Sequence, residues 1–288
     1  MSHGLLSIAG CVCLLACTPS PANPDGTASV NVPTGAWQRD WVRRGGGPSD
    51  RSVTVRYVQT PSVFGDLRIP EALPDMTGAT SLADLSEAQL LALAQQNGFA
   101  GVATVSGTNA TWRHEIDFQP PNKQPDVGRV EMLAPGKMFE HALDDSYVES
   151  WSTLDARPGA FAVRVMREDR ALYILAVSGQ HFMYARARKY PLPPGKSMID
   201  VFTRLRPDRK AIMAYLDCEI SYGNTHGWWI EYSTLPWLQG KRLAFADRIG
   251  IGADGGPIAL SPLRGETWTF PVNTLEPDEL VTLFAPTP

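Results

Sequence analysis

The chain has 288 residues, of which 43% are hydrophobic, so it is long enough to bury a sizeable core. Its 26 basic and 30 acidic residues leave a formal net charge of −4 at pH 7. Because nucleic-acid binding calls for a clustered basic face, this balance argues against a nucleic-acid partner.

The first element is an apolar run that begins at Leu5 and ends at Ala16. It is too short to cross a bilayer, which needs about 20 apolar residues, and is typical of a secretory signal over residues 1–16. Its end, LLAC, resembles a bacterial lipobox, which implies cleavage before Cys17 and lipidation of that thiol. The opening MSHG lacks the Lys or Arg usual in such signals, and the alternative is a buried terminal strand or helix.

Residues 17–36 follow and are rich in Pro, Gly, Ser and Asn, with little apolar content. We therefore expect an extended tether, held at a membrane by the acyl chains on Cys17. Thr18 stands where an Asp would favour retention in the inner membrane, by general resemblance to such lipoproteins. The expected location is the cell envelope, at the periplasmic face of the outer membrane.

The four cysteines agree with this interpretation. Cys11 and Cys13 would leave with the signal, Cys17 would be lipidated, and only Cys218 would remain. The mature protein then has no disulfide and depends on its core for stability. Since Cys218 shares strand parity with apolar neighbours, we expect a buried small hydrophobic residue and not a catalytic thiol.

Residues 37–158 contain about eight short segments in which apolar and polar residues alternate, the pattern of half-buried strands. One helix interrupts them at about 84–97, where Ser86 and Gln89 have capping-box spacing. These residues are the predicted first barrel.

Residues 159–288 continue with predicted strands, among them 197–206 and 211–223, and with a turn or two of helix at 277–284. We predict an all-β fold of two tandem antiparallel barrels with one inserted helix, residues 159–288 forming the second. The alternative is one larger barrel with long loops. An eight-stranded barrel can hold one small ligand or fill itself with side chains.

The strand 111–118 combines aromatic and ionisable residues. One face carries Trp112, His114, Ile116 and Phe118, and the other carries Arg113, Glu115 and Asp117. We expect the aromatic face to point inward and Arg113 and Glu115 to lie outside. Parity places Asp117 outside as well, unless the strand end bends. A lone His among apolar neighbours is more often a hydrogen-bonded core residue than a catalyst.

On the segment 146–151, Glu149 shares a face with Tyr147 and Trp151. Because an unpaired buried charge is very costly, Glu149 needs a cationic partner, and Arg68 is favoured over Arg129. Two interpretations stay open: a structural Arg–Glu pair that fills the barrel, or a polar anchor for a ligand in an aromatic cavity.

These residues resemble the pattern of the HRI family, fungal proteins named for their interaction with a casein kinase. The matching positions are Phe64, Asp66, Arg68, the segment 98–101, Trp112, Asp117, Asp126, Gly128, Glu140, Tyr147, Glu149 and Trp151. The resemblance covers residues 37–151 and implies a lipocalin-like first barrel and, by extension, a second. The chain would be a bacterial lipoprotein relative of that family. Where the pattern has Gly after the glutamate, this chain has Ala142.

The leading hypothesis is a lipid-anchored envelope protein that binds a small apolar or amphipathic molecule in its barrel. The candidate site comprises Arg68, Trp112, His114, Glu140, Tyr147, Glu149 and Trp151. One alternative is an isomerase or hydratase with His114 and Glu149 as acid and base, and another is a structural protein with filled barrels.

Other chemistry finds little support in the sequence. The segment 140–145 has four metal-ligand types, but without the spacing of known metal sites, and no P-loop, dinucleotide or G-x-S-x-G motif occurs. We therefore predict no metal and no cofactor. Trp228, Trp229 and Trp237 are expected in a core, with a stacking platform as the alternative. The sequence does not identify a protein partner.

Overall fold

The structure is a computed structural model that describes residues 33–121, 124–155 and 157–285. The predicted signal peptide, Cys17 and most of the predicted tether lie outside these residues. The first strand begins at Gly35, within the segment expected as tether. No helix in the described part of the chain is both long and apolar enough to cross a membrane.

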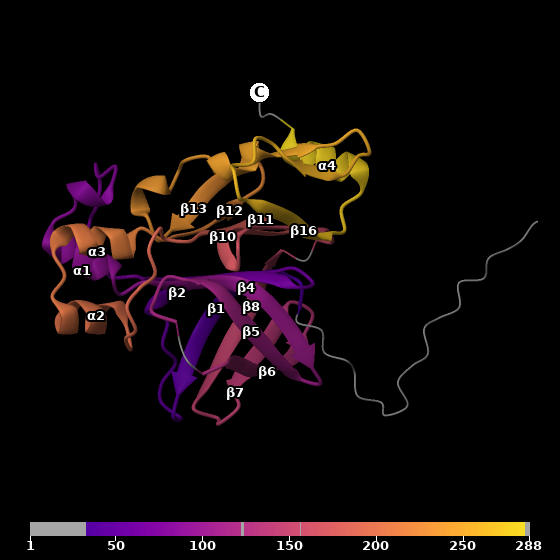
Figure 1. The fold of residues 1–288 in the computed structure, drawn as a ribbon. Coiled ribbons are helices and arrows are strands. Elements are labelled where there is room, and N and C mark those ends of the chain that lie inside the picture. The colour runs from indigo at the N-terminus through magenta and orange to yellow at the C-terminus, as the bar shows by residue number, and fades with distance from the viewer. Residues whose placement is uncertain (1–32, 122–123, 156, 286–288) are drawn as a thin grey trace, which may run out of the picture.

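Eight consecutive strands close into an antiparallel barrel, which confirms an all-β fold with a first barrel (Figure 1). Its strands are β1 (Gly35–Arg44), β2 (Val53–Gln59), β3 (Val63–Pro70), β4 (Asn97–Ser106), β5 (Asn109–Asp117), β6 (Asp126–Ala134), β7 (Lys137–Ala142) and β8 (Tyr147–Asp155). Each pairs with its neighbour in sequence, and β1 closes the barrel on β8 with Arg39 opposite Trp151. Alternate residues therefore point into the barrel.

The second half differs from the expected second barrel. Its strands form an open six-stranded sheet, in the order β13-β12-β11-β10-β9-β16, and a separate β14-β15 hairpin. They are β9 (Ala160–Arg167), β10 (Arg170–Ser178), β11 (His181–Arg186), β12 (Glu219–Asn224), β13 (Trp229–Ser233), β14 (Ile249–Ile251), β15 (Pro257–Ala259) and β16 (Thr267–Asn273). Because both faces of the sheet are covered, it buries its apolar side chains without closing on itself.

Four α-helices are described, where one inserted helix and a turn or two of helix at 277–284 were expected. They are α1 (Glu87–Leu93), α2 (Met198–Leu205), α3 (Arg209–Leu216) and α4 (Pro277–Phe284). The capping box of Ser86 and Gln89 begins α1 as predicted. The segments of α2 and α3 were expected as strands, and this was wrong. The side chains of Ser197 and Asp208 cap these helices by accepting hydrogen bonds from the third helical residue.

The barrel and the sheet share one hydrophobic core. The outer faces of β2, β3 and β4 pack on the sheet, so that apolar side chains of both halves form a single cluster. Figure 1 shows the sheet lying across the barrel wall, with α1, α2 and α3 at one side and α4 on the far face of the sheet. A Cβ at Gly65 would collide with the side chain of Met183, so glycine permits this close approach.

The far face of the sheet has a second apolar cluster, which includes Phe161, Leu175, Phe182 and Trp228 and is covered by α4. Trp228 donates a hydrogen bond through Nε1 to the carbonyl oxygen of Leu283 in that helix, at 3.0 Å. The sheet is thus a scaffold layer between the barrel and the C-terminal helix.

Candidate functional site in the first barrel

The seven predicted site residues all project from the inner face of the barrel. Arg68 comes from β3, Trp112 and His114 from β5, Glu140 from β7, and Tyr147, Glu149 and Trp151 from β8. Cross-strand pairs lie on the same face of a sheet, and the register places Glu140 opposite Glu149 and Gly101 opposite His114. Their role in ligand binding stays a prediction.

A β-bulge in β5 decides which of its ionisable residues enter the barrel. His114 pairs with Gly101, but Ile116 already pairs with Ala100, so the register shifts between them. The parity reverses at the bulge, because one extra residue is accommodated there. Asp117 consequently returns to the inner face beside Phe99, whereas Ile116 joins the core between the barrel and the sheet.

Arg113 and Glu115 lie on the outer face of the barrel, as expected, but in different environments. The Arg113 side chain is 65% exposed, whereas that of Glu115 is only 7% exposed. Glu115 forms an ion pair with Arg164 of β9, whose Nη2 lies 2.7 Å from Glu115 Oε1. Glu115 therefore connects the barrel to the second sheet.

Glu149 is buried and ion-paired, as expected, but its closest partner was not predicted. Arg39 Nη1 lies 2.5 Å from Glu149 Oε1, and both side chains are 4% exposed. Arg68 Nη1 is farther from the same oxygen, at 3.8 Å, and its Nε lies 2.7 Å from Asp66. The expectation that Arg68 is the main partner is corrected here: closure of β1 on β8 brings Arg39 next to Glu149.

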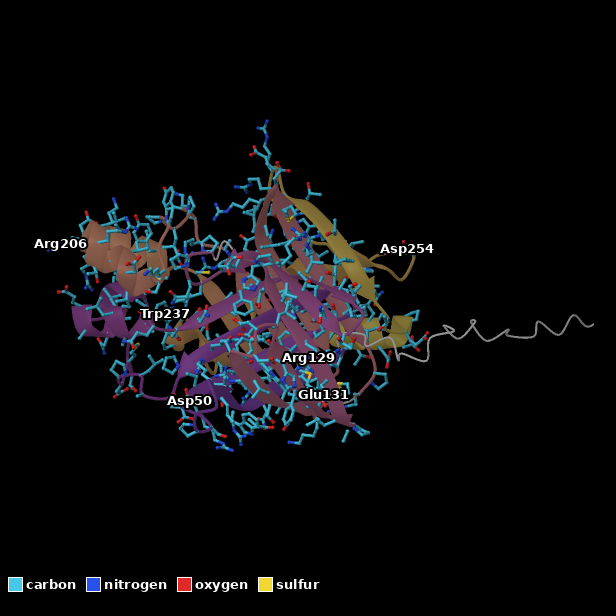
Figure 2. All side chains as sticks on the ribbon, turned by 90° about the horizontal axis from the view of Figure 1, so that it is seen from below. Asp50, Arg129, Glu131, Arg206, Trp237 and Asp254 are labelled. Carbon is cyan, nitrogen blue, oxygen red and sulfur yellow. The ribbon has the colours of Figure 1, made fainter. Side chains whose placement is uncertain are left out.

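The other predicted partner, Arg129, does not reach the interior. It lies with Glu131 on the outer face of β6 (Figure 2), because Gly128 and Val130 take the inward positions. Its side chain is 42% exposed and lies 4.0 Å from Asp145. Gly128 leaves room beneath the site, because a Cβ there would come within 3.2 Å of both Glu140 and Trp112.

Glu140 faces Glu149 across the β7–β8 pair and accepts a hydrogen bond from the Tyr147 hydroxyl at 3.0 Å. Burial, followed by the charge of Glu149, raises the pKa of Glu140 to about 8. At neutral pH this carboxyl group therefore holds a proton, as expected where two carboxyl groups share an interior.

His114 is held between two carboxylates. Its Nδ1 lies 2.6 Å from Asp117 and its Nε2 lies 3.0 Å from Asp126, while its ring stacks on Phe99 with centroids 4.0 Å apart. Burial lowers the pKa of His114, but the hydrogen bonds to Asp117 and Asp126 outweigh it and raise the pKa to about 9. The imidazolium form then uses both N–H groups.

The deeper part of the barrel is aromatic. Trp112 donates through Nε1 to the Tyr57 hydroxyl at 2.8 Å, and Tyr57 donates to Gln59. Trp151 is only 2% exposed. Among the described residues, Trp151 Nε1 and Glu149 Oε2 are buried without a hydrogen-bond partner.

A small cavity with a volume of about 20 Å³ lies beside Tyr57, Trp112 and Trp151. Its walls include Tyr57, Asp66, Arg68, Phe99, Trp112, Asp126, Val130, Met138, Glu140 and Trp151. A volume of roughly 10–15 Å³ on this measure admits one water molecule, so the cavity has room for one small chemical group.

Sequence reasoning missed Arg39 altogether and did not place Tyr57, Asp66 or Asp126 in the site. Asp66 and Asp126 were among the positions of the HRI resemblance, which was the available signal for them. Arg39 follows Trp37 by two residues, so strand parity put both on one face. What the sequence lacked was the pairing of β1 with β8.

The remaining candidates do not form a second site. No group of three or more His, Cys, Asp or Glu residues within the described ranges is arranged to hold a metal ion. Trp228 packs in the cluster under α4, whereas Trp237 packs against the core between barrel and sheet, so they share no stacking platform. Cys218 is fully buried, and burial raises the pKa of its thiol.

No protein-family model matches the chain, and no curated protein matches it. An uncharacterised protein from Saccharomyces cerevisiae has a solved structure with a TM-score of 0.47 and 11% sequence identity, covering 83% of this chain and 98% of that chain. An uncharacterised protein from Bacteroides eggerthii, also 11% identical, has a TM-score of 0.27 and covers 42% of this chain and 98% of that one. Similarities this low do not bear on function.

Proposed function

We propose that the first barrel binds a small molecule through its polar inner face. The observation that carries the proposal is the pair of buried, unpartnered atoms Glu149 Oε2 and Trp151 Nε1 in a barrel with a small internal cavity. Natural cores satisfy nearly all buried polar atoms, and an unsatisfied one costs about 1–3 kcal/mol. A bound molecule that offers a donor and an acceptor would remove this cost.

The cavity limits the size of the molecule. At about 20 Å³ it is far below the roughly 300–1,000 Å³ of pockets that enclose drug-sized ligands. The ligand is therefore small, or only one end of an apolar or amphipathic ligand enters. The mouth permits such entry, since the side chains of Arg68 and His114 remain 25% and 20% exposed.

The enzyme alternative receives less support from this geometry. A general base needs a free lone pair within reach of its substrate. Both ring nitrogens of His114 are engaged by carboxylates, so His114 has no free lone pair. Within the described residues Glu149 keeps one free oxygen, Oε2, but without His114 the predicted acid–base pair is incomplete. The structural alternative, a barrel filled by its own side chains, is the competitor that experiment has to exclude.

Native mass spectrometry of the protein purified from its own host tests the proposal. We expect a small bound molecule on the wild-type chain. Val130→Phe, which adds a ring to the cavity wall, should abolish this adduct, whereas Val105→Phe at the exposed end of β4 should retain it. A thermal melt checks that both variants fold. Wild-type protein without any adduct would favour the structural alternative.

We further propose that the protein is a lipoprotein of the cell envelope, anchored through Cys17 at the periplasmic face of the outer membrane. The support is the LLAC sequence and the Pro-rich segment behind it. Cys17→Ser should release the protein from membranes or leave its precursor uncleaved. If the variant matures and fractionates with membranes like wild type, the anchor proposal is wrong. Membership of the HRI family also stays a proposal, based on the matching positions of the sequence alone.

A further inference from the structure

The cations of the barrel interior are all paired with carboxylates. Arg39 contacts Glu149, Arg68 contacts Asp66, and His114 lies between two aspartates. A carboxylate or phosphate ligand would have to displace one of these internal pairs. The interior of the described barrel therefore offers no ready partner for an anion.

In contrast, the described barrel interior has more carboxyl groups than cationic side chains to pair with them. Glu149 is 3% exposed, and its Oε2 has no hydrogen-bond partner in the described residues. Glu140, directly across the β7–β8 pair, accepts from Tyr147 but has no cationic group of the described chain within 4 Å. Of these two neighbouring carboxyl groups, only Glu149 has cationic partners among the described residues, and one of its oxygens is still free.

The walls near these carboxyl groups also suit a cation. Trp112 and Trp151 line the same cavity as Glu140, together with Phe99 and Tyr57. The faces of aromatic rings attract cations, Trp most strongly, and such contacts strengthen when water is excluded. Phe99 already shows this behaviour, because the Arg68 guanidinium lies 5.4 Å from its ring centroid.

We propose that the ligand of this barrel carries a primary ammonium group that binds between Glu140 and Glu149. This rests on the proposed function, that the barrel binds a small molecule. The ammonium donates hydrogen bonds to Glu149 Oε2 and to the Glu140 carboxylate. Glu140 releases its proton to solvent when the ligand binds. Trp151 Nε1 donates to an oxygen atom of the same ligand, so a short amino alcohol is the simplest molecule that satisfies both unpartnered atoms.

Proton release gives the inference a quantitative signature. The ammonium ion pairs with Glu140 only when this carboxyl group is ionised, which is uncommon below its pKa of about 8. Affinity should therefore increase about fifty-fold between pH 6 and pH 8, as the ionised fraction rises. The amine stays protonated throughout, since simple amines titrate near the lysine value of about 10.4.

Calorimetric titration of the full chain with three probes of similar size tests this inference: ethanolamine, 1-propanol and propionate. We expect ethanolamine to bind, more tightly at pH 8 than at pH 6, and the other two to bind at least ten-fold more weakly. Glu140→Gln should lose the pH dependence and most of the affinity. Glu131→Gln, on the outer face of the adjacent strand, should bind like wild type.

The outcomes separate the two proposals. If 1-propanol or propionate binds as well as ethanolamine, and Val130→Phe abolishes that binding, the barrel is a ligand site but the ammonium inference is wrong. The same holds if the molecule found by native mass spectrometry contains no amine. If no probe binds and no adduct is found, both proposals fail. These comparisons on the wild-type chain stand even if Glu140→Gln does not fold.

An ammonium head group can belong to a free amine or to a lipid. Vesicle flotation distinguishes the sources: vesicles of phosphatidylethanolamine present the primary ammonium, whereas those of phosphatidylcholine present a bulkier trimethylated one. Unlipidated protein that floats only with phosphatidylethanolamine indicates the lipid source. Protein that binds ethanolamine but floats with neither indicates a free amine. Flotation with both lipids alike, without ethanolamine binding, would contradict the inference.

Discussion

The barrel and the second sheet differ in how much charge they bury among their apolar side chains. The interior of the barrel contains Arg39, Asp66 and Glu149 among its tryptophans. The sheet faces are built from runs such as Phe161-Ala162-Val163 and Leu175-Ala176-Val177, all fully or almost fully buried. Apolar packing stabilises at about 25 cal/mol per Å², whereas a buried ion pair often gives no net stabilisation over an apolar pair. Apolar packing stabilises both regions, but it does not explain the buried charges of the barrel interior.

The strongest test of this contrast is Glu149→Ala. Loss of the carboxylate leaves Arg39 buried and unpaired, and such a change costs about 3–5 kcal/mol. The double variant Arg39→Met, Glu149→Met should lose much less, because no charge is left unpaired. Urea unfolding at pH 7 measures both. A double variant as unstable as Glu149→Ala would show that the ion pair itself stabilises the barrel.

In the sheet, Leu175→Ala should cost about 2–5 kcal/mol, through lost burial and the cavity left behind. Since no charge is involved, the loss should be the same at pH 6 and pH 9. Leu263→Ala, at a residue that is 57% exposed, is the matched control and should be nearly neutral. A loss that changed with pH would contradict a purely apolar environment for Leu175.

The ion pair between the two halves should have an intermediate effect. Glu115→Ala removes hydrogen bonds from Arg164, and bonds to charged groups contribute about 1.5–3 kcal/mol. Arg113→Ala should change stability by about 0–1 kcal/mol, because that side chain is exposed. Equal unfolding midpoints for the two variants would mean that Glu115 does not connect barrel and sheet.

The last test concerns the pH dependence of stability. A raised pKa means that the folded state binds the proton more tightly than the unfolded state does. The proton then stabilises the fold fully below the unfolded-state pKa, and this stabilisation is lost as pH rises through the folded-state pKa. For Glu140 this window runs from pH 4.5 to about 8, and for His114 from pH 6.5 to about 9. Glu140→Gln should remove the decline in the first window, as followed by thermal melts.

Glu71→Gln provides the control for that measurement, because Glu71 is exposed just after β3. The stability of this variant should decline as pH rises, like that of the wild type. If Glu140→Gln declines as steeply as Glu71→Gln, the Glu140 carboxyl group does not hold its proton in the folded protein. The ammonium inference would then lose its expected pH dependence as well.

The sequence predicted the barrel and its inward residues because strand parity is local. Tyr147, Glu149 and Trp151 sit at every second position, and no bulge disturbs them in β8 opposite β7. Parity failed at Asp117, where a bulge shifts β5 by one residue. The signal was Gly101, since a Cβ there would collide with the Arg113 carbonyl oxygen.

Long-range pairing and caps explain the other differences. Arg39 could not be assigned to Glu149 from the sequence, because only barrel closure joins them. The helices α2 and α3 were open to prediction: Ser197 and Asp208 are good N-caps, and Met198, Val201 and Phe202 recur at helical spacing. Whether the second sheet stays open depends on the elements that cover its faces, and local sequence patterns do not predict these.

The pairing of β1 with β8 also has a consequence for the order in which the protein folds. Arg39 and Glu149 are separated by 110 positions, and the barrel seals only when β8 reaches β1. Contacts that close so long a loop form slowly, because the chain loses conformational entropy before these contacts can stabilise the fold. During synthesis, β1 leaves the ribosome long before its partner exists. Until then its inward arginine stays in water, so the charged interior should be among the last parts of the protein to assemble.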